Sequence, residues 1–189
     1  MNRSNRNEDM LKNDSVTVAK WLLGKTLYCN GKEAVITETE AYGDEDPTCY
    51  GVRYGKNKNT AISFQIGGHL FVYAGMLMIT TGKEEDKPQN VLLRAASRSD
   101  CRGPCRLKKY FGIDKNVNGT KIGFTPEDDV RITGDRDAPY TVALRGRFCE
   151  EKIARDYEKR YSVDHQKAIA ITHEYVCKKW RFACKNNKE

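Results

Sequence analysis

Along the first part of the chain, the apolar residues are spaced first as in a helix and then as in β-strands. Over residues 16–23 the apolar side chains fall on one helical face, with Asp14 or Ser15 placed to cap the first turn. Residues 25–29 and 33–42 have strand spacing and are joined by an Asn-Gly pair, which is typical of a hairpin turn. The pattern therefore predicts a helix followed by a β-hairpin.

The remainder of the chain continues this mixture of periods. Helices are predicted from Pro104 to Gly112 and over residues 150–161. Strands are predicted at 69–73, 76–81, 90–95, 129–133 and 139–147, with one or two more within 167–184. The order of elements indicates an α+β fold in which surrounding helices cover a curved, mostly antiparallel sheet.

The chain has no internal repeat or low-complexity linker, and its 189 residues suit a single core. We therefore expect one domain over residues 14–184. The polar ends, 1–13 and 185–189, are predicted to be tails, and the first of them to be disordered. Residues 43–59 are rich in Gly, Asp, Pro and Asn and form a predicted loop, longer than most connections and of a kind that often carries function.

The charge of the chain favours an anionic partner. Its 33 lysines and arginines outnumber its 26 aspartates and glutamates, which gives a net charge of +7. A solvated basic surface would give the same total, so charge alone does not identify nucleic acid. Apolar runs are too short to span a bilayer, and the start lacks the apolar core of a secretory signal. We expect an intracellular protein, cytoplasmic or nuclear, that does not enter a membrane.

The seven cysteines raise the alternative of a thiol-rich regulatory or zinc-binding protein. Three residues separate Cys101 from Cys105 and six separate Cys177 from Cys184, whereas zinc ribbons favour two. Cysteines of an intracellular chain usually remain thiols, and buried ones pack as small apolar residues. We therefore expect neither a metal nor a cofactor.

A run of alternating polar residues in the segment 33–42 carries the candidate chemistry. Glu38, Glu40 and Tyr42 would share one face of a strand, because successive side chains point to opposite faces. A solvated edge strand is the simplest interpretation, since glutamate is mostly exposed. The other interpretation is that this face lines a polar cleft.

Five short motifs follow one another and decide between these interpretations. They read ETEAY, DP, GGHLFVY, VLLRA and GP-x-R-L. In this order they resemble the alkyladenine (3-methyladenine) DNA glycosylase family, and the resemblance runs from about Val18 to Ile113. It implies a monofunctional, monomeric enzyme that flips alkylated or deaminated purines, such as 3-methyladenine, 7-methylguanine and hypoxanthine, out of duplex DNA. The enzyme would then hydrolyse the N-glycosidic bond without a cofactor.

The resemblance also assigns roles to individual residues. Glu40 matches the catalytic glutamate that deprotonates the attacking water, and Tyr42 and Tyr73 match the aromatic residues on the two faces of the flipped base. Arg94 matches an arginine that holds the backbone of the flipped nucleotide. Independently of the resemblance, Gly103 and Arg106 belong to a basic turn at a helix N-terminus, a place suited to a DNA phosphate.

The sequence departs from the family pattern around the predicted base pocket. Tyr50 stands where the family usually has a histidine that packs beside the base. The tyrosine that wedges into the duplex is missing, and Met76 is the substitute that the sequence offers. The family's pocket asparagine falls near Thr80 or Thr81, which we therefore expect to contact the base.

Two functions remain open at this point, an active glycosylase and a DNA-binding module of the same fold with weak or no turnover. An undisturbed ETEAY favours the enzyme, because a mere binder has no use for a carboxylate near DNA phosphates. The enzyme requires Glu40 to stand beside a cavity walled by aromatic side chains. A Glu40 side chain sealed in an ion pair would count against it.

Overall fold

The computed structural model describes residues 3–134, 137–146 and 148–185. Its strands are β1 (Thr26–Cys29), β2 (Lys32–Tyr42), β3 (His69–Tyr73), β4 (Met76–Thr80), β5 (Asn90–Ala96), β6 (Thr120–Lys121), β7 (Val130–Thr133), β8 (Tyr140–Ala143) and β9 (Arg181–Cys184). Its helices are α1 (Arg3–Leu11), α2 (Ser15–Trp21), α3 (Tyr50–Tyr54), α4 (Pro104–Phe111), α5 (Glu150–Tyr161) and α6 (His165–Val176). Short 3-10 turns are η1 (Ala61–Phe64), η2 (Ser99–Cys101) and η3 (Lys115–Val117).

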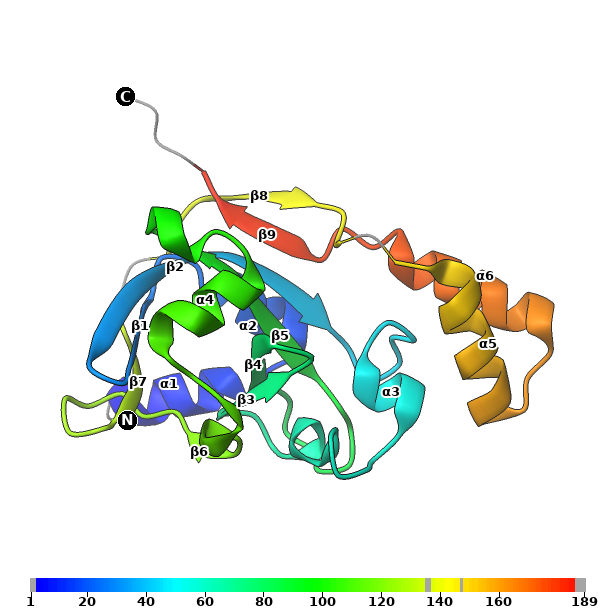
Figure 1. The fold of residues 1–189 in the computed structure, drawn as a ribbon, viewed down its shortest axis with the longest axis horizontal. Coiled ribbons are helices and arrows are strands. Elements are labelled where there is room, and N and C mark those ends of the chain that lie inside the picture. The colour runs from blue at the N-terminus through cyan, green and yellow to red at the C-terminus, as the bar shows by residue number, and fades with distance from the viewer. Residues whose placement is uncertain (1–2, 135–136, 147, 186–189) are drawn as a thin grey trace.

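The described strands form one open sheet in which neighbouring named strands are antiparallel (Figure 1). The strand order is β6-β3-β4-β5-β2-β1-β7, and β9 pairs with β2 and carries β8 on its other side. The long strand β2 is central, because its first half pairs with β1 and its second half pairs with β5 and β9. The predicted α+β class with a mostly antiparallel sheet is confirmed.

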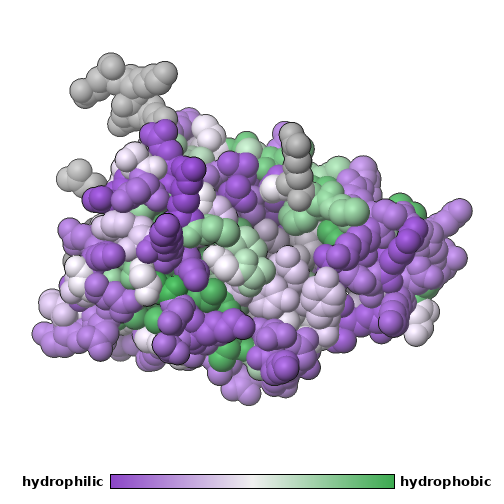
Figure 2. All heavy atoms as spheres, in the orientation of Figure 1, coloured by the Kyte–Doolittle hydropathy of each residue, from purple (hydrophilic) through white to green (hydrophobic). Residues whose placement is uncertain are grey.

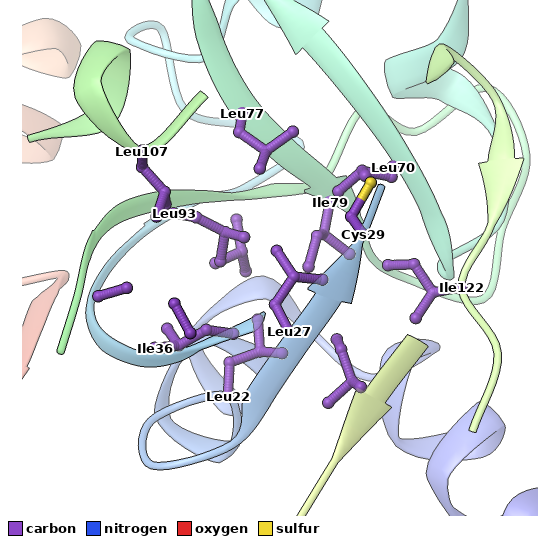
Figure 3. Close-up of a cluster of buried hydrophobic side chains, with 14 of the residues drawn as sticks. Leu22, Leu27, Cys29, Ile36, Leu70, Leu77, Ile79, Leu93, Leu107 and Ile122 are labelled. Carbon is purple, nitrogen blue, oxygen red and sulfur yellow. The ribbon is translucent and has the colours of Figure 1, made fainter. Parts of the chain in front are cut away.

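One face of the sheet buries the main hydrophobic core (Figure 3). Leu70, Ile79 and Leu93 from three neighbouring strands point into it, and Leu22 and Leu107 close it from the helical side. Burying each such side chain stabilises the fold by roughly 1.5–3 kcal/mol. The core therefore fixes which face of β2 points inward, and with it the face that remains for Glu40.

The N-terminal segment corrects the prediction of a tail over 1–13. Residues Arg3–Leu11 form α1, and the side chain of Leu11 is only 1% exposed. Gly67 packs so closely on the Leu11 carbonyl that a Cβ there would lie 2.0 Å from that oxygen. One buried leucine in a polar segment leaves almost no periodic signal, which is why the sequence pattern missed this helix.

The segment 167–184 is the second correction. We predicted one or two strands there, and it holds the strand β9 together with a helix, α6, that we did not predict. Asp164 caps α6 by accepting hydrogen bonds from the amides of Gln166 and Lys167, and packing against α5 outweighs the β-branched residues within the helix. At the C-terminus, the Lys185 amide donates to the Pro139 carbonyl, while the rest of the predicted tail lies outside the described residues.

The two helices α5 and α6 stand side by side at one end of the molecule (Figure 1). This end is dominated by hydrophilic side chains on the face shown in Figure 2. It is anchored to α3, where Arg53 forms an ion pair with Asp156 and the Tyr161 hydroxyl donates to the Val52 carbonyl over 3.0 Å. Helix α3 itself lies within the segment that we predicted as a loop. Among the described helices, none combines the length and the apolar character of a membrane span.

Candidate active site

Cross-strand pairing gathers the candidate residues on the sheet face opposite the main core. Glu40 pairs with Leu92 and Tyr42 pairs with Asn90 between β2 and β5, while Leu92 in turn pairs with Met78 of β4. Directly paired residues project to the same face, and residues two apart do so as well. Glu40, Tyr42 and Asn90 are therefore neighbours on one surface of the sheet.

Three donors converge on the Glu40 carboxylate, whose residue is 1% exposed. Its Oε1 accepts from Arg94 Nη1 and from the Gly146 amide, each over 2.9 Å. Its Oε2 accepts from the Tyr42 hydroxyl over 2.9 Å. Burial and then the Glu40 charge raise the pKa of the Tyr42 phenol well above its usual range, so this hydroxyl keeps its proton and donates.

A β-bulge in the β2–β5 ladder lies at Arg94. The β2–β5 ladder passes from the pair Glu38–Ala95 to the pair Thr39–Leu93, so Arg94 has no partner across the strands. Bulges of this kind bend a strand and re-aim one side chain, and they are frequent beside active sites. Alternation along β5 places Arg94 on the same face as Leu92, the partner of Glu40, so its guanidinium reaches the buried carboxylate next to the bulge.

Arg94 belongs to a cluster of four charges. Its guanidinium bonds Glu40 and lies 3.8 Å from Glu38, which forms an ion pair with Arg181 of β9. The Arg94 side chain is 21% exposed, so solvent reaches the cluster on the Arg94 side. The predicted contact of Arg94 with DNA stays a prediction, and in this structure its partner is Glu40. Glu40 is therefore sealed in the ion pair that counted against catalysis.

A small cavity lies beside this cluster of charges. It meets the other condition for an enzyme, which is a cavity walled by aromatic side chains next to Glu40. Tyr42, Tyr50 and Tyr73, which were predicted to contact the base, all line it, with Met78 and Leu92 among its apolar lining residues. The rings of Tyr50 and Tyr73 lie 4.3 Å apart, centroid to centroid. The remaining volume is about 20 Å³, enough for roughly one water molecule. Aromatic side chains are thus in place around a cavity that they close.

The other two residues predicted to contact the base, Thr80 and Thr81, do not line the cavity. Thr80 is fully buried, and its hydroxyl donates to the Ile66 carbonyl and accepts from the His69 amide. Thr81 is also fully buried, and neither threonine lines the cavity. In this structure the Thr80 hydroxyl holds a loop, while Asn90 across the ladder lines the cavity, so contact of the two threonines with a base stays a prediction.

The residues predicted to contact DNA lie along the same rim. Met76 lines the cavity, so the structure does not present it as a surface wedge. Gly103 precedes α4, and its amide donates to the Arg94 carbonyl over 3.0 Å. Its φ of +113° is accessible to glycine and strained for other residues. Arg106 is exposed on the first turns of α4, close in sequence to this contact.

Sequence reasoning did not identify Arg145, a buried residue that packs against the site and supports it. Its side chain is 0% exposed and forms an ion pair with Asp46, whose side chain is also 0% exposed. The guanidinium also donates to Thr48 Oγ1 over 2.8 Å and lies 5.1 Å from the centre of the Tyr42 ring. The segment 139–147 reads as a strand, and nothing in its spacing marks one arginine as buried.

All seven cysteines are free thiols. Cys29, Cys49 and Cys101 are buried, whereas Cys105, Cys149 and Cys177 are exposed and differ from the expectation of a buried apolar role. Within the described ranges, no three His, Cys, Asp or Glu side chains lie together as ligands for a metal ion.

The fold and this site define a class of protein in which a buried carboxylate and a tyrosine-lined cavity lie next to each other on one face of an antiparallel sheet. Residues 9–188 match the family described as Methylpurine-DNA glycosylase (MPG), and the chain belongs to this family. The predicted resemblance is confirmed and extends beyond Ile113 to nearly the end of the chain.

Three relatives illustrate the similarity, and each is named "Putative 3-methyladenine DNA glycosylase". The relative from Rickettsia rickettsii (strain Sheila Smith) is 38% identical over 144 residues, which cover 70% of this chain and 76% of the relative. The relative from Natranaerobius thermophilus is 27% identical and covers 95% of this chain and 94% of its own length. That from Bdellovibrio bacteriovorus is 28% identical and covers 88% and 95%.

Proposed function

We propose that this protein is a monofunctional DNA-3-methyladenine glycosylase, which flips a damaged purine out of duplex DNA and hydrolyses its N-glycosidic bond. The observation that carries the proposal is the hydrogen bond between Glu40 and Tyr42, since it ties the candidate base catalyst directly to the wall of the cavity. Membership of the glycosylase family and the net charge of +7, suited to a DNA backbone, support it.

The chemistry needs few groups. Extruding a base costs a few kcal/mol of unstacking, least for a damaged base. Tyr42 on one side and Tyr73 with Tyr50 on the other would stack against the extruded purine, and electron-rich rings favour a cationic, alkylated base by about 0.5–2 kcal/mol. Glu40 would remove a proton from water as the bond breaks, and its charge would stabilise the oxocarbenium-like sugar. A cationic purine leaves as a neutral base, so no general acid is required.

Two rearrangements must accompany binding. A purine is several times larger than the present cavity, so the rings of Tyr50 and Tyr73 must separate from Tyr42 to admit it. Water must also reach Glu40, which now bonds Arg94. The partly exposed Arg94 side chain is placed to leave Glu40 for a phosphate of the flipped nucleotide, the partner that the family resemblance assigns to it. The unbound structure would then be the closed state.

Single-turnover release of 3-methyladenine, 7-methylguanine and hypoxanthine from duplex DNA tests the proposal. We expect Glu40→Gln to lower release by about 10²–10⁴-fold while DNA binding survives, because general-base catalysis contributes about this much. Glu33→Gln is the matched control, since Glu33 is an exposed glutamate on the same strand. Equal release by wild type and Glu40→Gln would remove Glu40 from the mechanism.

The second candidate is a DNA-binding module of the same fold with little or no turnover. The sealed Glu40–Arg94 pair and the closed cavity favour it, because neither is ready for catalysis as it stands. Retained DNA binding by a wild-type protein that releases none of the three bases would identify this function. Damaged purines as the ligand, and a monomeric state, belong to the proposal in either case.

A further inference from the structure

Three side chains at the open end of the α5–α6 hairpin form a chain of contacts that the site on the sheet does not use. Cys177 directly follows α6, and its Sγ lies 3.5 Å from Nε2 of His173, one helical turn earlier. The other ring nitrogen, Nδ1, lies 3.0 Å from Oε2 of Glu150, the first residue of α5. A thiol, an imidazole and a carboxylate therefore follow one another, outside the lining of the tyrosine cavity.

The carboxylate decides which nitrogen of the imidazole faces the thiol as a base. An ionised carboxylate only accepts hydrogen bonds, so the proton of a neutral His173 ring lies on Nδ1, toward Glu150. Nε2 then carries a lone pair and accepts a hydrogen bond from the Cys177 thiol. A nucleophile within hydrogen-bond reach of a base, with the base oriented by a third group, is the arrangement that activates hydroxyl and thiol nucleophiles in enzymes.

Small molecules in solution can reach these three residues. Cys177 is exposed, and the side chains of His173 and Glu150 are 64% and 42% exposed. An ion pair that is this exposed contributes little to the stability of a fold. A metal ion is not the ligand that the geometry favours, because Glu150 bonds the ring nitrogen that does not face the sulfur. Only the thiol and one nitrogen would remain as ligands, whereas zinc takes three or four from the protein.

The place of His173 in the last turn of α6 suits a proton transfer from the thiol. The carbonyl end of a helix carries partial negative charge, which favours a cationic imidazole and opposes a free thiolate. The proton therefore passes to His173 as the sulfur attacks, and His173 then holds a proton for the leaving group. Hydrogen peroxide needs both halves of this transfer, because its departing hydroxide takes up a proton. An alkylating agent that releases a halide needs only the first half.

We propose that Cys177 is a site of oxidation by hydrogen peroxide, with His173 as its base and Glu150 as a positioning residue. The sulfur attacks one peroxide oxygen, so that an S–O bond forms while the O–O bond breaks. His173 takes the thiol proton and gives it to the departing hydroxide, which leaves as water. Cys177 becomes a sulfenic acid, and the two electrons that the sulfur loses reduce the peroxide. The inference does not depend on the proposed function, because it uses none of the residues at the cavity.

The experiment measures how fast each thiol is lost to hydrogen peroxide near neutral pH, by alkylating the remaining thiols and mapping them by mass spectrometry, with dimedone to trap the sulfenic acid. Cys149 is the matched comparator, because it is an exposed thiol that precedes α5 at the same end of the hairpin. It is a stringent one, since helix N-termini generally make thiols more reactive. Its rate is taken from Cys177→Ser, in which the two thiols cannot condense into a disulfide. We expect Cys177 to react about tenfold faster or more, because a positioned base contributes at least this much.

Variants of the two partners test their roles, and both side chains are exposed enough to be replaced without harm to the fold. His173→Ala should bring Cys177 to the rate of Cys149. Glu150→Ala should slow Cys177 in wild type but have no further effect in His173→Ala, because Glu150 acts through the imidazole, and Glu150→Gln should restore the rate in part. Equal rates for Cys177 and Cys149, or an unchanged rate in His173→Ala, overturn the inference. Equal slowing of oxidation and of alkylation by iodoacetamide in His173→Ala overturns the assignment of peroxide as the reactant.

Discussion

Replacing Arg145 by methionine removes a buried charge while keeping most of the volume of its side chain. The guanidinium forms the ion pair with Asp46 and also donates to Thr48 Oγ1 and to the carbonyls of Ala41 and Tyr175. Removing one partner of a buried pair destabilises a protein by about 3–5 kcal/mol, because the other charge remains buried without compensation. At about 2–4 °C per kcal/mol for a chain of this size, the melting temperature should fall by roughly 6–20 °C.

Thermal and urea unfolding of wild type and Arg145→Met measure this loss. The double variant Asp46→Asn/Arg145→Met is the control, and it should recover a substantial part of the stability because it leaves no uncompensated charge. The Oδ1 acceptor of residue 46, which takes hydrogen bonds from the amide and hydroxyl of Thr48, is kept in either variant, as a carboxylate oxygen or as an amide oxygen. A loss below about 1 kcal/mol in the single variant, or no recovery in the double variant, would refute the reasoning.

Three further predictions concern the buried thiol, the N-terminal helix and the cavity wall. The unfolded Cys49 thiol ionises near pH 8.5 and the folded one at about 11, so the unfolding free energy should fall as pH rises through this window, by about 3 kcal/mol. Cys49→Ala should lose that slope, and identical pH profiles by urea titration would contradict it. Leu11→Ala should cost about 2–5 kcal/mol in urea unfolding, because the side chain is buried, whereas a disordered tail would cost nothing. Tyr73→Leu should reduce release of cationic 3-methyladenine more than release of neutral hypoxanthine, and equal reductions would exclude preferential stacking of cations on this ring.

Local sequence signals predicted the helices and strands whose ends are marked by residues within or next to the element. Asp14 caps α2 as expected, and the charged helix over 150–161 begins and ends where its pattern indicated. The helices α1 and α6 were missed because tertiary packing stabilises them. In α1 a single residue, Leu11, docks on the body of the protein, and α6 is set by its cap and by α5. Neither contact has a counterpart in the spacing of residues along the chain.

The site divides in the same way. Strand alternation and motif order brought Glu40, Tyr42 and Tyr73 to one place, as the structure has them. Which amide side chain lies at the cavity depends on which residues pair between β4 and β5. The paired residues lie 10 or more positions apart in the chain, so local sequence spacing does not determine their register. Thr80 and Asn90 pair across this ladder, and of the two only Asn90 lines the cavity.

The cluster of Glu38, Glu40, Arg94 and Arg181 carries two negative and two positive charges, and so it is neutral as a whole. A bare carboxylate at the rim of this surface would repel the sugar-phosphate backbone at every step of a search along intact DNA. Under the proposed function, the arginines would let this surface move over undamaged duplex without that penalty, and the negative charge would be unmasked only where an extruded nucleotide draws a guanidinium away. The ion pair between Arg94 and Glu40, which blocks catalysis in the unbound protein, would thus keep the site inactive over undamaged DNA and allow reaction only at a lesion.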